Sequence, residues 1–481
     1  MNTYLLVALC LAGAELLRRI YLALTVAFTG PLSKIPGPFW NKLSPLPWAI
    51  QNLTGNAMNI APKYFEKYGE VIRVGPRDIM IAEKSGVQKI LIDEDFIKAP
   101  IYQSIRMHPG VTSLITERDR AVYRQKRRLI SPGFSISYLN GLEPLMKECL
   151  DVFERCLNAE VKKGGGYAVI DMNQMLGNLT SDVMSATSFG GSFGLVESND
   201  KRLRNLVLDR LKRAALDAQF PFINYLPFVP PSQGDEFNSI IDNIVAKRKD
   251  SGKKKKDLLQ IFVDVNDANP ETFSHLHLRE EMSLFMIAGS DTTSTTATFT
   301  LVLLLNNQDK LKKLVEEIDT SFPSKDDPIT FARTQELPYL NAVINESMRV
   351  MPIVALGLAR YAEEDTIISG YEIPKGTIVA PAIGQLMKDP RIWPDPERFV
   401  PQRWLEGYKG TKADTKAFHP FSSGSRNCPG QQFALRELRI ILVTLFLRYE
   451  LSLISGQSHE MRLHSVPWFT QGFYNVGVKR R

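Results

Sequence analysis

The chain has 481 residues, of which 44% are hydrophobic and 23% charged, and it carries a formal net charge of +7. This composition is that of a globular protein and excludes a collagen, a coiled coil and long disorder. The positive charge allows nucleic acid, an acidic protein or an anionic membrane surface as a partner. Four cysteines in so long a chain, none with zinc-ribbon or redox spacing, indicate a reducing compartment.

The N-terminal segment is apolar. Residues 5–14 are uncharged, and Arg18 and Arg19 then interrupt a second apolar run. A helix that spans a bilayer needs about 20 apolar residues, and an arginine pair at the bilayer centre is costly. We therefore expect residues 1–29 to form a membrane anchor, a short transmembrane helix that ends at the arginine pair on the cytosolic side. A signal peptide cleaved near residues 12–14 is the alternative, although it lacks the usual N-terminal positive charge.

A proline-rich hinge follows the anchor at residues 30–40, with Pro31, Pro36 and Pro38. Prolines fix the backbone and resist helix formation, so this segment is expected to be a stiff linker. The globular body then runs over residues 41–481. An anchor, a hinge and a body together indicate a membrane-tethered catalytic domain.

Helical periodicity dominates the body, and the strand-like runs are short. The expected elements are strands at 71–74 and 79–81, helices at 121–129, 139–161, 278–306 and 431–448, a proline-rich break at 221–231 and a hairpin turn at 370–376. This pattern predicts a mainly α fold with a smaller β region. Basic runs at 247–249 and 253–256 flank a Ser-Gly pair and are typical of a solvated loop, so we expect no nucleic-acid partner.

Two pairs of residues are noteworthy within the expected helices. Asp291 and Thr292 lie in a helix rich in threonine, which is a poor helix former, so burial must stabilise that helix. Glu346 and Arg349 are three residues apart and share one helical face. Taken alone, the first pair indicates polar packing in a buried helix and the second a surface salt bridge of little energetic value.

Cys428 lies just before the last expected helix, in the cysteine loop (residues 421–430, Phe-Ser-Ser-Gly-Ser-Arg-Asn-Cys-Pro-Gly). Free N–H groups and the positive end of the helix dipole favour a thiolate there, and iron requires the thiolate form. Gly424 and Gly430 allow the backbone to pass close to a flat ligand. Arg426 can pair with an anionic group on that ligand.

The cysteine loop resembles the FxxGxRxCxG signature of the cytochrome P-450 superfamily. Every fixed position matches, namely Phe421, Gly424, Arg426, Cys428 and Gly430. The resemblance runs from the hinge to the C-terminus. Within the superfamily, the sequence is most similar to microsomal fungal enzymes of secondary metabolism. It implies the triangular-prism fold of that family and a haem b cofactor, with Cys428 as the thiolate ligand of the iron.

The resemblance also implies roles for the helical motifs. Residues 288–293 resemble the oxygen-activation motif, which implies that Thr292 bonds the distal oxygen, that Asp291 supplies protons and that Gly289 leaves room for dioxygen. Glu346 and Arg349 match the ExxR motif, and its third partner is expected to be Arg398. This Glu-Arg-Arg network is structural and supports the cysteine loop.

Contacts to the haem propionates are implied for three further residues. Arg127 matches the arginine of the WxxxR motif, and Tyr123 takes the aromatic position, where tyrosine departs from the usual tryptophan or histidine. Arg360, eleven residues after Arg349, fits another propionate-binding arginine. These contacts would place cations beside the carboxylates of the cofactor.

The implied reaction inserts one oxygen atom from O2 into a bulky apolar substrate. Electrons would come from an NADPH-dependent flavoprotein reductase, and the catalytic domain would face the cytosol from the endoplasmic reticulum membrane. Complementary charge is expected to guide the acidic reductase. Its basic docking residues are expected to be Arg124, Lys126, Arg128, Arg436 and Arg439. The substrate lining is expected to include Ile101, Tyr102, Ile105, Met107, Phe285, Val354, Leu356, Trp468 and Phe469.

Two other functions compete with monooxygenation. One is a haem-thiolate isomerase or dehydratase that needs no external electrons. The other is a haem-binding or membrane adaptor protein without catalysis. The retained pair Asp291-Thr292 favours the monooxygenase over both.

Overall fold

The computed structural model describes residues 3–106, 108, 110–220, 234–464 and 466–481. Its backbone groups into two compact units. The first comprises residues 1–99, 355–386 and 422–426, and the second comprises 100–354, 387–421 and 427–481. The segments expected to form the anchor and the hinge, residues 1–29 and 30–40, fall within the first unit.

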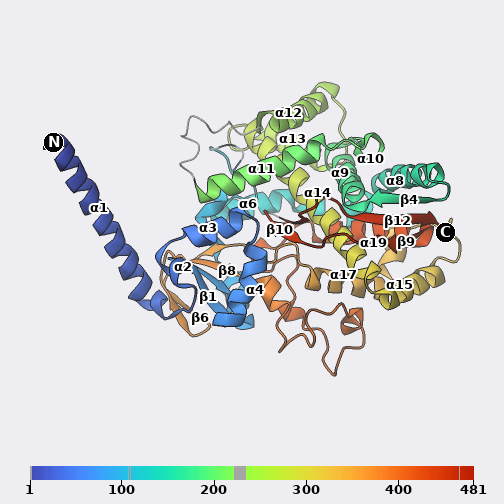
Figure 1. The fold of residues 1–481 in the computed structure, drawn as a ribbon. Coiled ribbons are helices and arrows are strands. Elements are labelled where there is room, and N and C mark those ends of the chain that lie inside the picture. The colour runs from blue at the N-terminus through green and yellow to red at the C-terminus, as the bar shows by residue number, and fades with distance from the viewer. Residues whose placement is uncertain (1–2, 107, 109, 221–233, 465) are drawn as a thin grey trace. The chain divides into compact units, whose positions relative to one another are not determined.

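The first unit is built around a small mixed sheet (Figure 1). Its strands are β1 (Val71–Gly75), β2 (Asp78–Ile81), β3 (Ile97–Lys98), β5 (Arg360–Tyr361), β6 (Thr366–Ile368), β7 (Tyr371–Ile373) and β8 (Ile378–Pro381). Its helices are α1 (Thr3–Phe28), η1 (Pro31–Lys34), α2 (Phe39–Leu43), α3 (Leu46–Leu53), α4 (Ala57–Tyr68), α5 (Lys84–Gln88), η2 (Lys89–Asp93), α18 (Ile383–Leu386) and η8 (Gly424–Arg426).

The sheet has the order β1-β2-β8-β5-β3, while β6 and β7 form a separate hairpin. The strands expected around the Gly-Pro turn are confirmed as β1 and β2, which pair antiparallel with Ile72 opposite Met80. Side chains alternate across a strand. Accordingly, Ile79 and Ile81 enter one apolar cluster of the first unit, and Met80 enters the other.

Arg73 of β1 fastens the N-terminal segment to this sheet. Its buried guanidinium donates to the carbonyl oxygens of Val26 at 2.8 Å and Ala27 at 3.1 Å, near the end of α1. It also donates to Leu32 in the hinge at 3.0 Å. Carbonyls in the last turn of a helix have no partner within the helix. The buried arginine satisfies them and fixes where the hinge leaves the sheet.

The second unit is mainly helical (Figure 1). Its helices are η3 (Pro100–Gln103), α6 (Arg120–Ile130), η4 (Ser131–Phe134), α7 (Ile136–Asn140), α8 (Glu143–Lys163), α9 (Met172–Phe189), α10 (Leu195–Ser198), α11 (Arg202–Gln219), α12 (Gly234–Ser251), α13 (Leu258–Ala268), α14 (His275–Leu305), α15 (Gln308–Ser321), α16 (Phe331–Gln335), α17 (Pro338–Val350), η6 (Pro401–Trp404), η7 (Thr415–Ala417) and α19 (Gln431–Arg448). Its strands are β4 (Tyr167–Asp171), β9 (Tyr449–Leu453), β10 (Met461–Leu463), β11 (Pro467–Phe469) and β12 (Asn475–Arg480).

Helix α14 lies at the centre of the second unit and packs against α9, α17 and α19. Its threonines are accommodated because their hydroxyls turn back onto the helix. Thr292, Thr296 and Thr300 each donate to the carbonyl oxygen four residues earlier at 2.8 Å. With these groups satisfied, burial of the helix overrides the poor helix propensity of threonine, as the sequence required.

Several expected elements differ from those observed. The helix expected at 139–161 is divided into α7 and α8, because Pro144 lacks an N–H and suits the first turn of a helix. Residues 371–373, expected within a hairpin turn, form β7, and the turn lies at Ser369 and Gly370, which both have positive φ. The break expected at 221–231 lies outside the described residues.

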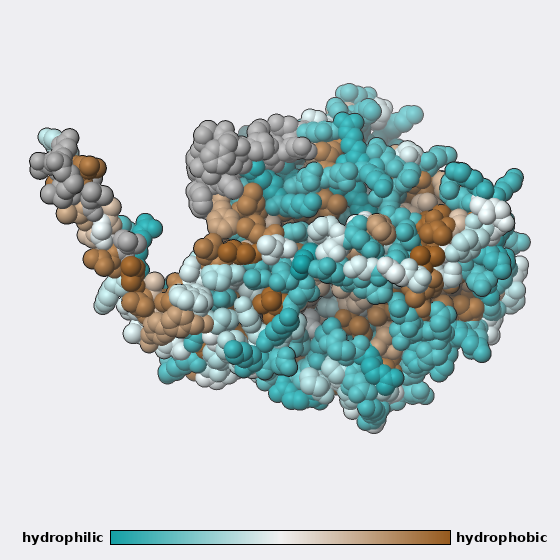
Figure 2. Space-filling view, viewed as in Figure 1, coloured by the Kyte–Doolittle hydropathy of each residue, from teal (hydrophilic) through white to brown (hydrophobic). Residues whose placement is uncertain are grey.

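Helix α1 carries exposed apolar side chains along its length, which Figure 2 shows as brown surface. The salt bridges from Arg18 and Arg19 to Glu15 lie in its middle. In the described part of the chain, we find no helix whose length and apolar character suffice to cross a membrane. The expected transmembrane helix is therefore not supported.

Candidate active site

The cysteine loop positions Cys428 just before α19, whose N-cap residue is Gly430. The Cys428 N–H donates to the carbonyl oxygen of Phe421 at 2.9 Å. The Gly430 N–H in turn donates to the Cys428 sulfur. The thiol therefore sits at a helix N-terminus, as the sequence predicted.

The environment of the thiol is less favourable to the thiolate than the sequence indicated. Burial raises the pKa of Cys428, and the Gly430 N–H and the charge of Arg127 lower it by less. Yet the side chain is exposed. Cys428 thus has many protein neighbours although its side chain remains accessible. Burial therefore outweighs the helix terminus in its effect on this pKa, whereas coordination to a cation ionises a thiol.

Arg127 of α6 holds the cysteine loop from the side. Its guanidinium donates to the Asn427 carbonyl oxygen at 3.0 Å and to the Asn427 side-chain oxygen at 2.9 Å. Tyr123, one turn earlier, is buried in the core of the second unit. Arg127 thus contacts the residue next to Cys428, and its contact to a propionate stays a prediction.

Three expected cofactor residues belong to the first unit. A Cβ on Gly424 would lie 1.8 Å from the carbonyl oxygen of Leu91, and Gly424 has a φ of +77°, so only glycine fits. Arg426 is buried in η8. Arg360 is buried in β5, and its guanidinium donates to the carbonyl oxygen of Leu358 at 2.9 Å.

One stripe of α14 consists of Glu281, Phe285, Ala288 and Thr292, at helical spacing. Ala288 is exposed and Thr292 half-buried, although most of the helix is buried. This α14 stripe thus presents a methyl group and a hydroxyl to an open space.

The position of Gly289 on α14 differs from the one that the sequence led us to expect. A Cβ there would lie 2.4 Å from the terminal methyl of Met184, so Gly289 faces α9. Its small size allows α14 and α9 to pack closely. The open position beside Thr292 is provided by Ala288 instead.

Asp291 is buried next to the α14 stripe. Burial raises the pKa of its carboxyl group, and the charge of Arg204 lowers it by less. Within the described residues, one of its oxygens, Oδ2, has no hydrogen-bond partner. A carboxyl group in this state retains its proton to a higher pH than an ordinary aspartate.

Glu346 and Arg349 form the expected pair, but Arg398 is not its third member. The Glu346 carboxylate accepts hydrogen bonds from Arg349 at 2.9 Å, from Arg403 at 3.1 Å and from the Trp404 indole at 2.9 Å. The Arg398 side chain is largely exposed and lies 3.7 Å from Asp395.

A signal for Arg403 exists in the sequence. Residues 401–404 (Pro-Gln-Arg-Trp) repeat the Pro-x-Arg-aromatic pattern of residues 396–399 five positions later. The two runs cannot be distinguished by pattern alone. Burial shows which arginine pairs with the buried Glu346, because Arg403 is buried and Arg398 is not.

The expected basic docking face is smaller than the sequence indicated. Arg124 and Arg128 are exposed on α6, but Lys126 is buried and paired with Glu281 at 3.3 Å. Arg436 is also buried, with its guanidinium over the ring of Phe331. These two buried side chains are therefore not available for direct contact with a partner protein.

The other docking and lining residues have mixed positions. Arg439 is half-buried and donates to Asn341 at 2.7 Å. Of the apolar lining residues, Phe285 and Tyr102 are buried, Met107 lies outside the described residues, and Phe469 packs against the rings of Phe299 and Tyr474. Phe469 is therefore a core residue rather than a lining residue.

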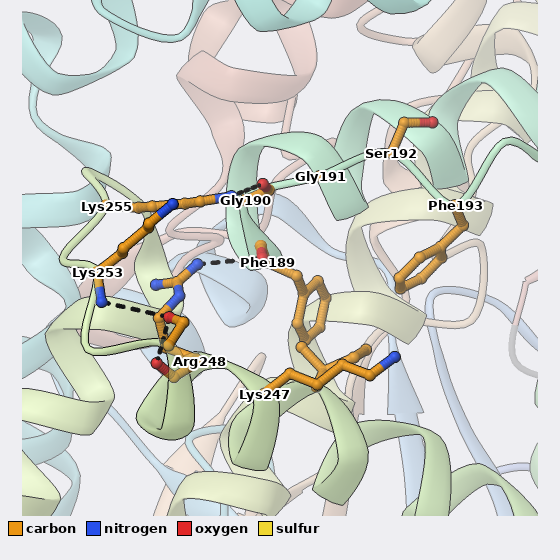
Figure 3. Close-up of a pocket in the computed structure, with 11 residues that line it drawn as sticks. Phe189, Gly190, Gly191, Ser192, Phe193, Lys247, Arg248, Lys253 and Lys255 are labelled. Carbon is orange, nitrogen blue, oxygen red and sulfur yellow. Dashed lines mark hydrogen bonds between the residues drawn. The ribbon is translucent and has the colours of Figure 1, made fainter.

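A cavity of about 430 Å³ lies where α9 ends beside α12 (Figure 3). None of its lining residues belongs to the predicted haem site. Arg248 donates to the Phe189 carbonyl oxygen at 3.2 Å, and Lys255 donates to that of Gly190. These cations cap the C-terminus of α9. The cavity is therefore not the predicted haem site.

The residues present fit a haem with a thiolate ligand. Cys428 offers the sulfur, and the α14 stripe offers an open methyl and hydroxyl. The ring of Phe134 lies 5.7 Å from that of Phe285 and 3.9 Å from a Cβ placed on Gly430. The cysteine loop and the stripe therefore share a neighbour within the second unit.

Comparisons with known proteins agree with this arrangement. The family model for cytochrome P450 matches residues 36–474. Cytochrome P450 monooxygenase LUC2 of Fusarium sp is 33% identical over 470 residues, which cover 96% of this chain and 91% of that protein. Cytochrome P450 monooxygenase FUS8 of Gibberella moniliformis is 33% identical over 457 residues, with coverages of 94% and 89%. Mouse cytochrome P450 3A25 is 29% identical over 434 residues, with coverages of 85% and 84%. The chain, with its thiol at the start of α19 and its polar stripe on α14, therefore belongs to the cytochrome P450 family of haem-thiolate monooxygenases.

Proposed function

We propose that Cys428 is the thiolate ligand of haem iron and that the chain oxidises a bulky apolar secondary metabolite. The observation that carries the proposal is the accessible thiol of Cys428 at the N-terminus of α19. Bound haem supplies an iron centre that activates dioxygen, and a thiolate ligand favours cleavage of the O–O bond. The electrons come from an NADPH-dependent flavoprotein reductase.

The chain itself supplies protons at the α14 stripe. The Thr292 hydroxyl donates to the Ala288 carbonyl oxygen at 2.8 Å, which leaves its lone pairs free to accept. Asp291, the preceding residue, can pass on a proton more readily than an ordinary aspartate, because burial raises the pKa of its carboxyl group. In this proposal the Thr292 hydroxyl orients the proton donor, and the Asp291 carboxyl group supplies the next proton.

The test of this function is an oxygen-tracing experiment. The haem-loaded protein is mixed with reductase, NADPH, ¹⁸O₂ and a panel of polycyclic and terpenoid compounds. We expect a product with one ¹⁸O atom that forms only when reductase and NADPH are both present. A rearranged or dehydrated product that forms without them would show that the isomerase or dehydratase function is correct.

The Thr292→Ala variant should bind haem normally but waste electrons. Without the hydroxyl, proton delivery is misdirected, and general acid catalysis contributes about 10²–10⁴-fold to such steps. We expect the product formed per NADPH consumed to fall at least about tenfold, with the rest appearing as peroxide or water. The matched control is Thr296→Ala, which removes the same kind of hydroxyl-to-carbonyl bond one turn later. Equal losses in both variants would refute a special role for Thr292.

We also propose that α1 anchors the protein in the interfacial layer of the endoplasmic reticulum membrane, with the catalytic domain in the cytosol. The ring centroid of Phe39 lies 5.8 Å from that of Phe28 and 5.2 Å from that of Trp40, and all three side chains are exposed. Aromatic side chains favour the membrane–water interface, and an apolar helix can lie within it.

The membrane proposal predicts that α1 and the aromatic pair Phe39 and Trp40 contribute additively to membrane binding. Deleting residues 2–24 removes most of α1 but keeps the Val26 and Ala27 carbonyls that Arg73 binds. We expect the truncated protein to remain partly bound to microsomes and to be released completely when Phe39 and Trp40 are also changed to serine. Sedimentation at neutral pH and physiological salt measures the bound fraction. The proposal fails if a salt wash alone releases the full-length protein.

A further inference from the structure

The second unit holds a pair of adjacent buried acids that the catalytic motifs do not use. Glu280 and Glu281 lie in the second turn of α14, and each is no more than 2% exposed. Acids are rarely so buried without a specific partner. Their partners are backbone N–H groups of the chain before α6 and one lysine of α6.

The two carboxylates hold the backbone of this chain segment. Glu280 accepts a hydrogen bond from the N–H of His108 at 2.5 Å. Glu281 accepts one from the N–H of Leu114 at 3.0 Å. Such bonds to an ionised acceptor are stronger than those between neutral groups. We call residues 110–117 the clamp loop.

Lys126 closes the arrangement from α6. Its buried ammonium lies 3.3 Å from the second oxygen of Glu281 and also donates to the carbonyl oxygen of Thr112. One lysine thereby connects α14, α6 and the clamp loop. Because a buried ion pair is costly unless both charges keep partners, removing either one should release the loop.

The clamp loop covers one end of the α14 stripe. Glu281, Phe285, Ala288 and Thr292 follow one another at helical spacing, so the carboxylate that binds the loop lies on the face that carries the catalytic hydroxyl. Ala288 lies two turns, or about 10 Å, from Glu281. A loop fixed there limits the space available to a molecule bound beside Ala288.

We infer that Glu281 and Lys126 are positioning residues that set substrate selectivity by holding the clamp loop against α14. The inference deepens the proposed function and rests on it, because selectivity has meaning only if substrate binds beside Thr292. The pair does not touch the reacting atoms. It acts through the loop, so its loss should affect large ligands more than small ones.

The experiment uses the haem-loaded full chain and the variant Glu281→Gln. The amide of glutamine can still accept the Leu114 N–H, but it cannot neutralise Lys126. Imidazole and 4-phenylimidazole are the probes, since an imidazole nitrogen binds iron and only the second probe carries a bulky apolar group. We expect the ratio of the two dissociation constants, read from the haem absorbance, to change about tenfold. Hydrogen exchange of residues 110–117 should become faster by a similar factor.

The matched control is Glu317→Gln. Glu317 also accepts two backbone hydrogen bonds, from Tyr339 at 2.7 Å and Leu340 at 2.8 Å, but at the start of α17. We expect this variant to alter neither the ligand ratio nor exchange in the clamp loop. An equal change of the ratio in both variants would mean general loosening and would overturn the inference.

A second variant covers the case in which Glu281→Gln does not fold. Lys126→Met leaves the carboxylate in place and removes the lysine contact to the Thr112 carbonyl, so it should also speed exchange of the loop. Unchanged exchange in the variants, or faster exchange with an unchanged ligand ratio, would overturn the inference. If neither probe binds iron in the wild-type protein, the proposed function fails, and hydrogen exchange still reports on the clamp independently.

Discussion

The Cys428→Ala protein should fold but lose thiolate ligation and with it all monooxygenase activity. The loop itself should survive, because the bond from the Cys428 N–H to the Phe421 carbonyl oxygen involves only backbone atoms. The sulfur has no substitute in alanine, and a thiolate is what directs cytochrome P450 chemistry towards O–O cleavage. The reduced carbon-monoxide difference spectrum measures the loss directly.

Cys149 provides the matched control for this experiment. It is a buried cysteine of α8, and burial raises the pKa of its thiol to about 12, so it remains a neutral apolar side chain. Cys149→Ala should leave the carbon-monoxide spectrum unchanged. A thiolate spectrum that persists in Cys428→Ala would refute the assignment of the ligand.

Replacing Glu346 with alanine should lower the free energy of unfolding by about 3–5 kcal/mol, the cost of breaking a buried ion pair. The side chains of Glu346 and Arg349 are fully buried, and Arg403 is nearly so. Alanine would leave both guanidinium groups without their shared anion, and it would remove the acceptor of the Trp404 indole. Urea unfolding of the haem-loaded protein measures the change.

The same unfolding assay distinguishes Arg403 from Arg398 as the second arginine that pairs with Glu346. Arg403→Met removes a buried partner of Glu346, so it should be strongly destabilising. Arg398→Met removes an exposed ion pair with Asp395, so we expect a change of at most about 1 kcal/mol. If Arg398→Met were the more destabilising of the two, the pairing of Glu346 with Arg403 would be wrong.

Local sequence patterns were sufficient wherever the decisive contacts lie within a few residues. The spacing of Glu346 and Arg349 placed them on one helical face, and they do form an ion pair. The position of Cys428 before an apolar helical run predicted its place at the start of α19. The family itself was evident from the cysteine loop, because its signature requires several fixed positions within ten residues.

The sequence alone determined the family, the ligand loop, the mainly helical body and the paired motifs, because helix periodicity and loop signatures are local. Only the tertiary structure decided which of two similar arginines meets Glu346, that Gly289 faces α9, and that Lys126 turns inward to Glu281. Each depends on packing between segments distant in the chain. The local sequence around a basic or small residue does not show whether its side of the helix faces water or protein. The cost of burying a charge depends on whether the tertiary structure supplies a partner of opposite charge.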